Sequence, residues 1–248
     1  MSIATEIQRL QTAKADIKTA IEEKGVEVGN GTIGTYAEKI SKISSGEDLV
    51  KYADNIQFRN LNLFEKEEVI LNLDNIGDLT NLCSAKVGAE YNNKTVKRIT
   101  VNCPNQVTSM NFAFGTSGYY DMTLEHITLN VDTSKCTDWG QTFLKVGALK
   151  IIDGTPLNFS LINYDTSRTF SATDGLEEVR FVENSIVRNI SFSDSANLSN
   201  DTVESVINGL ADLTGKTTKT LTFHATVGAK LTDTQKATIT AKNWTLAY

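Results

Sequence analysis

The chain has 248 residues, of which 40% are hydrophobic and 22% are charged, a composition typical of a folded protein. Its net charge of −6, without any Lys/Arg cluster, argues against a nucleic-acid-binding protein. No stretch approaches the about 18 apolar residues of a membrane span, and the charges within residues 1–24 argue against a signal peptide. We therefore expect a soluble product made in the cytoplasm, unless it leaves the cell by lysis or a leaderless route.

Residues 1–24 are predicted to form an attachment helix with a narrow apolar seam. With residues 7, 14 and 21 at heptad position a, only Lys14 interrupts the aliphatic a and d positions. Such a seam is typical of a coiled coil, and isoleucine at both a and d favours a homotrimer. A lysine at one a position costs stability but can fix the register. The alternative is a monomeric helix lying on its own domain. The predicted oligomerisation residues are Ile3, Ile7, Leu10, Ile17 and Ile21.

Residues 25–48 are predicted to be a Gly-rich linker with a short helix over residues 35–43. The segment GNGTIG, residues 29–34, matches the glycine spacing of a dinucleotide-binding turn. However, the preceding VEV is too short for a buried strand, and no βαβ unit surrounds it. We interpret this segment as a turn and expect no cofactor.

Residues 49–197 carry a repeat with a period near 28 residues. Its markers are four threonines at intervals of 28, 29 and 29 residues: Thr80, Thr108, Thr137 and Thr166. Each opens a segment that we predict to be a short helix with the threonine as N-cap. Between these segments lie apolar runs typical of strands, which start at Val69, Val96, Leu124, Leu149 and Leu176. A fixed period of this size predicts a solenoid, in which no unit can bury its own apolar face.

Aromatic and sulfur-containing side chains of the repeat are predicted to fill its core. They are Met110, Phe114, Trp139 and Phe143, followed by phenylalanines at 11-residue intervals, Phe159, Phe170, Phe181 and Phe192. The cysteines Cys83, Cys103 and Cys136 lack metal-ligand spacing and are interpreted as buried thiols. His126 and His224 lie in strand-like runs and are interpreted as structural. We expect no catalytic residue and no metal site.

Loops that break the period are the candidate contact surfaces. The segment 115–122, GTSGYYDM, places Tyr119 and Tyr120 side by side. Exposed tyrosines give much contact area at a low entropic cost. We therefore predict these two residues as receptor contacts, with packing of the loop itself as the alternative.

Residues 198–248 are predicted to cap the solenoid. A helix with Ser199 or Asn200 as N-cap is expected to end at Gly215, and a strand follows over residues 219–227. A second helix capped at Thr232 leads into a final strand, WTLAY. Such a segment covers the end of a repeat stack, which otherwise exposes an unpaired edge. The expected fold is therefore α+β: a coiled-coil helix, an irregular leucine-rich-repeat-like solenoid of strands and short helices, and an α/β cap.

Three parts of the chain resemble bacteriophage proteins. The closing segment LSNDTVESVINGLADLTGKTTKTLTFHATVGAKLTDTQKATITAKNWTLAY resembles the C-terminal region of tail-associated phage and prophage proteins. TSMNFAFGTSGYYDMTLEHITLN is similar to a degenerate leucine-rich repeat of the bacterial surface-protein type, and IATEIQRLQTAKADIKTAIEEKGVEVGNGTIGTYAEKI is similar to the N-terminal module of phage tail and fibre proteins. No catalytic residues accompany this resemblance.

The resemblance implies a virion protein without enzymatic activity, a trimeric tail fibre or baseplate-associated component. Its expected partners are further copies of itself, other virion proteins through the N-terminal helix, and a host surface glycan or protein. One alternative is an architectural head fibre, collar or decoration protein that touches no receptor. A bacterial surface adhesin is a second, and a glycan depolymerase using carboxylates such as Glu177 and Glu178 is a third.

Overall fold

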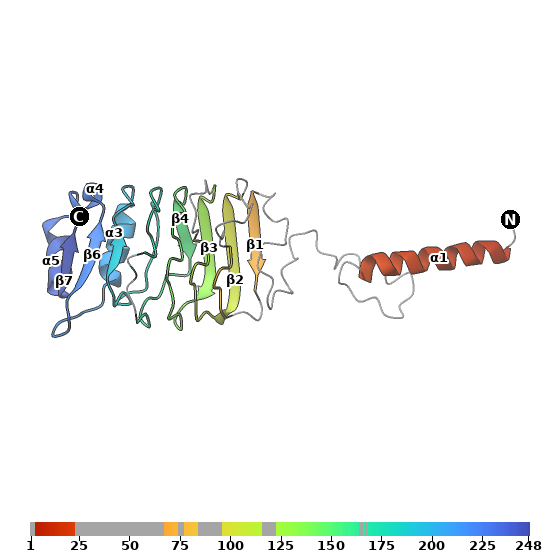
Figure 1. Cartoon of the computed structure of the whole chain (residues 1–248), viewed down its shortest axis with the longest axis horizontal. Coiled ribbons are helices and arrows are strands. Elements are labelled where there is room, and N and C mark those ends of the chain that lie inside the picture. Colours follow the sequence, from red (N-terminus) through yellow and green to blue (C-terminus); the bar gives the residue numbers. More distant parts are fainter. Residues whose placement is uncertain are drawn as a thin grey trace. The chain divides into compact units, whose positions relative to one another are not determined.

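The computed structural model describes residues 3–22, 67–73, 77–83, 96–115, 123–163, 166 and 168–248. The chain divides into two compact units, Met1–Leu49 and Val50–Tyr248. The described residues form a mixed α/β structure with two parallel sheets and four helices (Figure 1). The linker predicted over residues 25–48 and the tyrosine pair Tyr119 and Tyr120 lie outside the described residues.

The N-terminal unit contains the predicted helix. It is α1, Ile3–Glu22, a single helix of 20 residues and about 30 Å in length at about 1.5 Å per residue. Lys18 and Glu22, one turn apart on its surface, form an ion pair at 3.7 Å. The predicted helix is therefore confirmed, whereas its predicted association with other copies stays a prediction.

Four of the five predicted strands of the repeat are confirmed. They are β1 (Glu68–Asn72), β2 (Arg98–Gln106), β3 (His126–Asp132) and β4 (Ile151–Gly154), which pair in chain order into one parallel sheet (Figure 1). β4 ends at Gly154, whose φ is 89° and where a Cβ atom would lie 2.5 Å from the carbonyl oxygen of Leu129. Side chains alternate between the two faces of the sheet, so Val69, Ile99, Ile127 and Ile152 stack in register inside the core.

The fifth predicted strand, from Leu176, is wrong. This segment makes only isolated bridges, from Glu178 to Ile151 and from Phe181 to Leu157. On its other side lies a helix, α3 (Asn200–Gly209), instead of a further strand. The hydroxyl oxygens of Thr202 and Ser205 in α3 accept hydrogen bonds from the backbone N–H groups of Val179 and Phe181, at 3.1 and 2.9 Å. Side chains of a helix therefore satisfy backbone groups that a strand partner would have paired, and no continuous ladder forms.

The predicted short helices of the repeat are also wrong where the structure describes them. The segments after Thr108 and Thr137 are turns whose backbones bond to the neighbouring turn. Met110 N donates to Asp138 O at 2.7 Å, and Phe112 N donates to Gly140 O at 2.9 Å. Equivalent positions in three successive turns have positive φ values of 60°, 51° and 58°, at Asn81, Phe112 and Gln141. A left-handed residue stops a helix from propagating, and the hydrogen bonds run between turns instead.

Thr108, Thr137 and Thr166 act as donors to an adjacent coil and not as N-caps. We call a coil the stretch of chain from one position to its counterpart in the next repeat. Thr137 donates to Thr108 O from its backbone nitrogen at 3.0 Å and from Oγ1 at 3.4 Å. Thr108 likewise donates to Gly77 O, at 2.7 and 3.0 Å. Gly77, and not Thr80, is therefore the structural counterpart of Thr108. The Thr166 hydroxyl donates to a backbone carbonyl 23 residues further on. Equal spacing in the sequence thus identified the period, but Thr80 and Thr166 are not the structural counterparts of Thr108 and Thr137.

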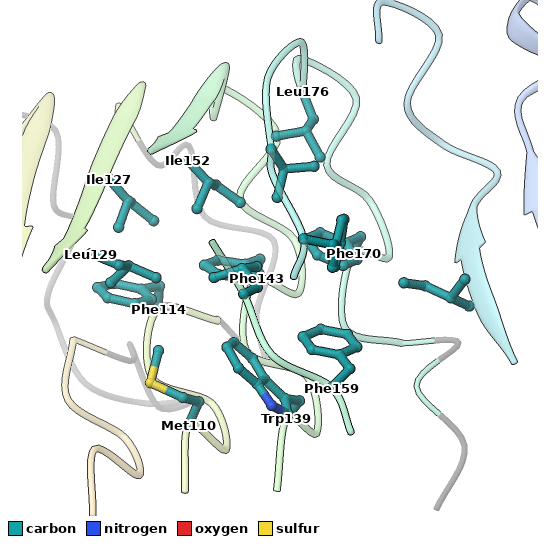
Figure 2. Packing of buried hydrophobic residues seen from close by; sticks show 14 of the residues in the cluster. Met110, Phe114, Ile127, Leu129, Trp139, Phe143, Ile152, Phe159, Phe170 and Leu176 are labelled. Carbon is teal, nitrogen blue, oxygen red and sulfur yellow. The ribbon is translucent and has the colours of Figure 1, made fainter. Parts of the chain in front are cut away.

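An aromatic column runs through the core between the sheet and the turns. Five phenylalanines stack in succession at centroid separations of 5.8, 5.4, 4.8 and 6.1 Å: Phe114, Phe143, Phe170, Phe192 and Phe223. Figure 2 shows Phe114, Phe143 and Phe170 in this column, with Ile127 and Ile152 pointing into the core from the side of the strands. A shorter row holds Trp139 against Phe159 at 4.5 Å and Phe159 against Phe181 at 5.3 Å. The predicted burial of the aromatic core is confirmed. Phe159 and Phe181 are 22 residues apart, as are Phe170 and Phe192, so the 11-residue interval places two phenylalanines in this one coil.

Residues 190–248 form a second parallel sheet with three helices, so this sheet begins before the predicted cap at residue 198. Strands β5 (Ile190–Phe192), β6 (Lys219–Phe223) and β7 (Trp244–Ala247) pair in this order. α4 (Ala225–Gly228) begins after His224, whose Nδ1 accepts from Thr226 N, so the predicted strand over residues 219–227 ends early. Helix α5, Asp233–Ala241, has the predicted cap at Thr232 with a complete capping box.

Helix α3 begins as predicted and ends early. Ser199 is its N-cap and accepts a hydrogen bond from Thr202 N. Its end at Gly209 corrects the prediction of a helix reaching Gly215. Lys242 explains this end, because its Nζ atom donates to the carbonyl oxygens of Ile207, Asn208 and Leu210 at 3.1, 3.1 and 2.7 Å. A cation that bonds these carbonyl groups satisfies the helix end and complements its dipole.

Candidate functional site

The outer face of β1–β4 carries a regular array of polar side chains. Asn72, Asn102 and Asn130 lie in register across β1, β2 and β3. Asn102 Nδ2 donates to Asn72 Oδ1 and Asn130 Nδ2 donates to Asn102 Oδ1, both at 2.8 Å. Because each amide is held by its neighbour, these side chains lose little further entropy on contacting another molecule.

A second column, beside the start of the strands, alternates in charge. Backbone hydrogen bonds connect Glu67, Lys97, Glu125, Lys150 and Glu177 in successive coils. Lys97 pairs with Glu67 at 2.8 Å and Lys150 pairs with Glu125 at 3.3 Å. If a coil paired with the next but one instead of with its neighbour, two residues of like charge would lie opposite each other. The alternation therefore favours the observed pairing of neighbouring coils.

The Lys97–Glu67 contact shifts both ionisations in the direction that favours the charged pair. Its hydrogen bond, and then its Coulombic attraction, lower the pKa of Glu67 and raise the pKa of Lys97. The Glu67 contribution to stability is therefore lost as the pH falls through its folded-state pKa. The Lys97 contribution is lost as the pH rises through its own folded-state pKa. Both are fully present between the ordinary pKa of a glutamate and that of a lysine.

We expect Lys97→Glu to lower the melting temperature near neutral pH, because it places a third carboxylate between Glu67 and Glu125. The loss should shrink with added salt, which screens exposed charges, and again at acid pH where the carboxylates are protonated. Lys230→Glu, at another exposed lysine, is the control with the same change in net charge. Thermal unfolding at two salt concentrations measures both variants, and equal losses would contradict the charge column.

His126 and Asp153 form a polar pair on the same outer face. His126 Nε2 lies 2.9 Å from Asp153 Oδ2 and 3.4 Å from Thr128 Oγ1. A hydrolase triad needs its carboxylate and its hydroxyl on opposite ring nitrogens, so that the base can be oriented while it takes the hydroxyl proton. Both contacts here fall on one nitrogen. The arrangement therefore lacks triad geometry. The contact between His126 and Asp153 joins β3 to β4, which agrees with the interpretation of His126 as a structural residue.

The cysteines and a group of carboxylates beside α3 are further candidate sites among the described residues. Cys103 and Cys136 are buried and Cys83 is partly buried, and all three thiols are without a disulfide. Burial raises the pKa of Cys136 to about 12, which keeps its thiol protonated and unreactive at neutral pH. A depression beside α3, lined by the carboxylates of Glu183, Asp201 and Glu204, is wide open to solvent. No group of three or more His, Cys, Asp or Glu residues able to hold a metal occurs within the described ranges.

The predicted oligomerisation residues lie on one helix as expected. The side chains of Ile7, Leu10 and Ile17 are 51%, 55% and 38% exposed, whereas Ile21 is buried. No helix within the described ranges is long and apolar enough to cross a membrane. The polar outer face was not predicted as a site, although its signal was present: polar residues alternate with apolar ones in RITVN and HITLN, two residues apart.

Comparison with known proteins adds no family to this description. No family model, no curated protein and no solved structure matches the chain. The described residues therefore define a fold class only, a mixed α/β protein with parallel sheets.

Proposed function

We propose that this protein is a non-enzymatic structural component of a bacteriophage virion, a trimeric tail fibre or baseplate-associated protein. In this proposal α1 associates with two further copies and attaches the trimer to other virion proteins. The repeat region then faces outward as a leucine-rich-repeat-like solenoid, on which strands and turns supply extended surface. The resemblance of the two ends of the chain to phage proteins supports this role.

The exposed seam of α1 is the observation that carries the proposal. Of the seven large hydrophobic side chains that are exposed among the described residues, three lie on this one helix: Ile7, Leu10 and Ile17. They are spaced three and seven residues apart, as the d and a positions of a heptad require. A soluble helix with this stripe gains free energy by burying it, at about 25 cal/mol per Å² of apolar surface. Identical copies offer identical stripes, which a trimeric coiled coil buries together.

Stacking in the repeat region supports the outward-facing part of the proposal. The coils that contain β2 and β3 each contribute one strand to the sheet, one turn and at least one aromatic ring to the core, and each bonds to the coils beside it. Stability of this kind is set by neighbouring coils, so outer side chains can vary without loss of the fold. The ordered amides on β1–β3 are where we propose contact with a host surface glycan or protein.

We expect the double variant Ile7→Asp with Ile17→Asp to be monomeric under conditions where the unaltered chain is a trimer. Two buried aspartates in each helix would place six carboxylates in the apolar seam. Sedimentation equilibrium at micromolar concentration measures the mass, and circular dichroism should show that the repeat region remains folded.

The matched control is Thr12→Asp with Thr19→Asp, which adds the same charges at exposed positions off the predicted seam. This control should remain trimeric. An unaltered chain that sediments as a monomer, or a control that dissociates as readily as the seam variant, would overturn the proposal.

An architectural role without any receptor is the second candidate. The amides of Asn72, Asn102 and Asn130 favour it because they already hydrogen-bond one another. Particles that lack the protein separate the two roles. Intact particles that fail to adsorb to host cells indicate a receptor contact, whereas particles that fail to assemble indicate an architectural part.

A further inference from the structure

One charged side chain interrupts the apolar seam of α1 at its centre. Lys14 occupies the same heptad position as Ile7 and Ile21, one heptad from each. Its side chain is exposed in the single chain. In a parallel coiled coil, side chains at this position point toward the axis, where the neighbouring copies place the same residue.

No carboxylate on α1 is placed to neutralise this lysine. The neighbours one turn away on the helix surface, at i±3 and i±4, are Leu10, Gln11, Ile17 and Lys18. The positions that flank the seam beside it carry Ala13 and Ala20, which bear no charge. Asp16 follows two residues later and therefore points to another side of the helix, while Glu22 pairs with Lys18.

Three such lysines in one layer would bring three positive charges together between apolar layers. The repulsion is much stronger there than in water, because the flanking isoleucine and leucine layers exclude solvent. Charges in such a place require a compensating partner of opposite sign. Three ammonium groups around an axis supply donors from three directions, which suits a small anion that accepts from all of them.

We propose that the trimer binds a small inorganic anion, a halide or an oxyanion such as sulfate, on its axis between the three Lys14 ammonium groups. This inference rests on the proposed trimer and deepens it. The anion makes assembly dependent on anion concentration, because it binds the trimer and not the separated chains. Lys14 is then a ligand that pins the register of the helices, since a shifted helix would lose one of the three donors.

Sulfate titration of the full chain tests the site. At constant ionic strength, maintained with the bulky anion gluconate, millimolar sulfate should lower the trimer dissociation constant by about tenfold and then reach a plateau. Saturation separates binding at a site from screening, which depends on ionic strength alone. Sedimentation equilibrium supplies the dissociation constants.

Two variants make the outcome decisive. Lys14→Met should give a tighter trimer than the unaltered chain in gluconate and no response to sulfate, because the charges that need the anion are gone. Lys18→Met, which removes a charge one turn away, should keep the sulfate response. An equal sulfate response in Lys14→Met, or an unaltered trimer that ignores sulfate, would overturn the anion site.

Crystals of the trimer grown with bromide provide a direct view. An anomalous peak on the three-fold axis at the level of Lys14 is expected, and lysine side chains that turn outward to solvent with no peak there would exclude the site. A chain that is monomeric throughout the titration contradicts the proposed trimer itself, whereas a trimer without anion dependence contradicts only this inference.

Discussion

Phe143→Ala is expected to lower the free energy of unfolding by about 3–5 kcal/mol, the usual effect of deleting a buried aromatic side chain. Phe143 is fully buried and stacks between Phe114 at 5.8 Å and Phe170 at 5.4 Å. Its removal leaves a cavity in the middle of the aromatic column, and the rings on both sides lose their stacking partner. Urea unfolding of the full chain, followed by circular dichroism, measures the loss.

Leu161→Ala is the matched control, because Leu161 is 45% exposed on a turn. Truncation of this side chain should change the free energy of unfolding by less than about 1 kcal/mol. If Phe143→Ala lowered the free energy of unfolding no more than this control, Phe143 would not be buried in the aromatic column. The stacking of its coil on the neighbouring coils would then be wrong.

Lys242→Met is expected to lower the free energy of unfolding by about 2–3 kcal/mol, because charge-assisted hydrogen bonds contribute more than neutral ones. The Lys242 ammonium reaches Leu210 O at 2.7 Å and two further carbonyl oxygens at the end of α3, and Asn184 Oδ1 at 3.3 Å. Methionine keeps most of the side-chain length and removes these four charge-assisted hydrogen bonds, whereas the carbonyl oxygens of Ile207 and Asn208 keep their backbone donors, Leu210 N and Asn184 N. Thermal and urea unfolding both measure the change.

A lysine that is exposed elsewhere provides the comparison. Lys230→Met removes the same charge from the same compact unit, and we expect it to be close to neutral in stability. Equal effects of the two substitutions would show that the loss at Lys242 arises from net charge, and that the carbonyl groups of α3 find other donors.

Local signals in the sequence located α1, the starts of α3 and α5, and four of the five strands predicted in the repeat. Short apolar runs that start at Val96 and Leu124 predicted β2 and β3. Ser199 and Thr232 marked the starts of α3 and α5, because a hydroxyl that accepts from the first turn acts within three residues along the chain. These features are decided over a few neighbouring residues and so are readable before the fold is known.

Local signals did not show which residues of successive repeats are structural counterparts. Thr80 and Thr108 look equivalent at an interval of 28 residues, yet the backbone of Thr108 bonds to Gly77. Coils here differ in length, from 30 residues between β1 and β2 to 25 between β3 and β4, and only pairing in space shows which residues oppose each other. Spacing along the chain therefore found a repeat without finding its register.

The sequence alone determined that this chain has a heptad-patterned helix, strands with one apolar face and two capped helices near its end. Only the tertiary structure decided that the segments after Thr108 and Thr137 are turns. It also decided that α3 ends at Gly209, where Lys242, 33 residues further along the chain, donates hydrogen bonds to the last carbonyl groups of the helix. Hydrogen bonds to a neighbouring coil compete with those inside a short helix, and which set wins depends on a partner far away in the chain. The ordered amides on β1–β3 and the alternating charges beside them likewise exist only once the coils are stacked.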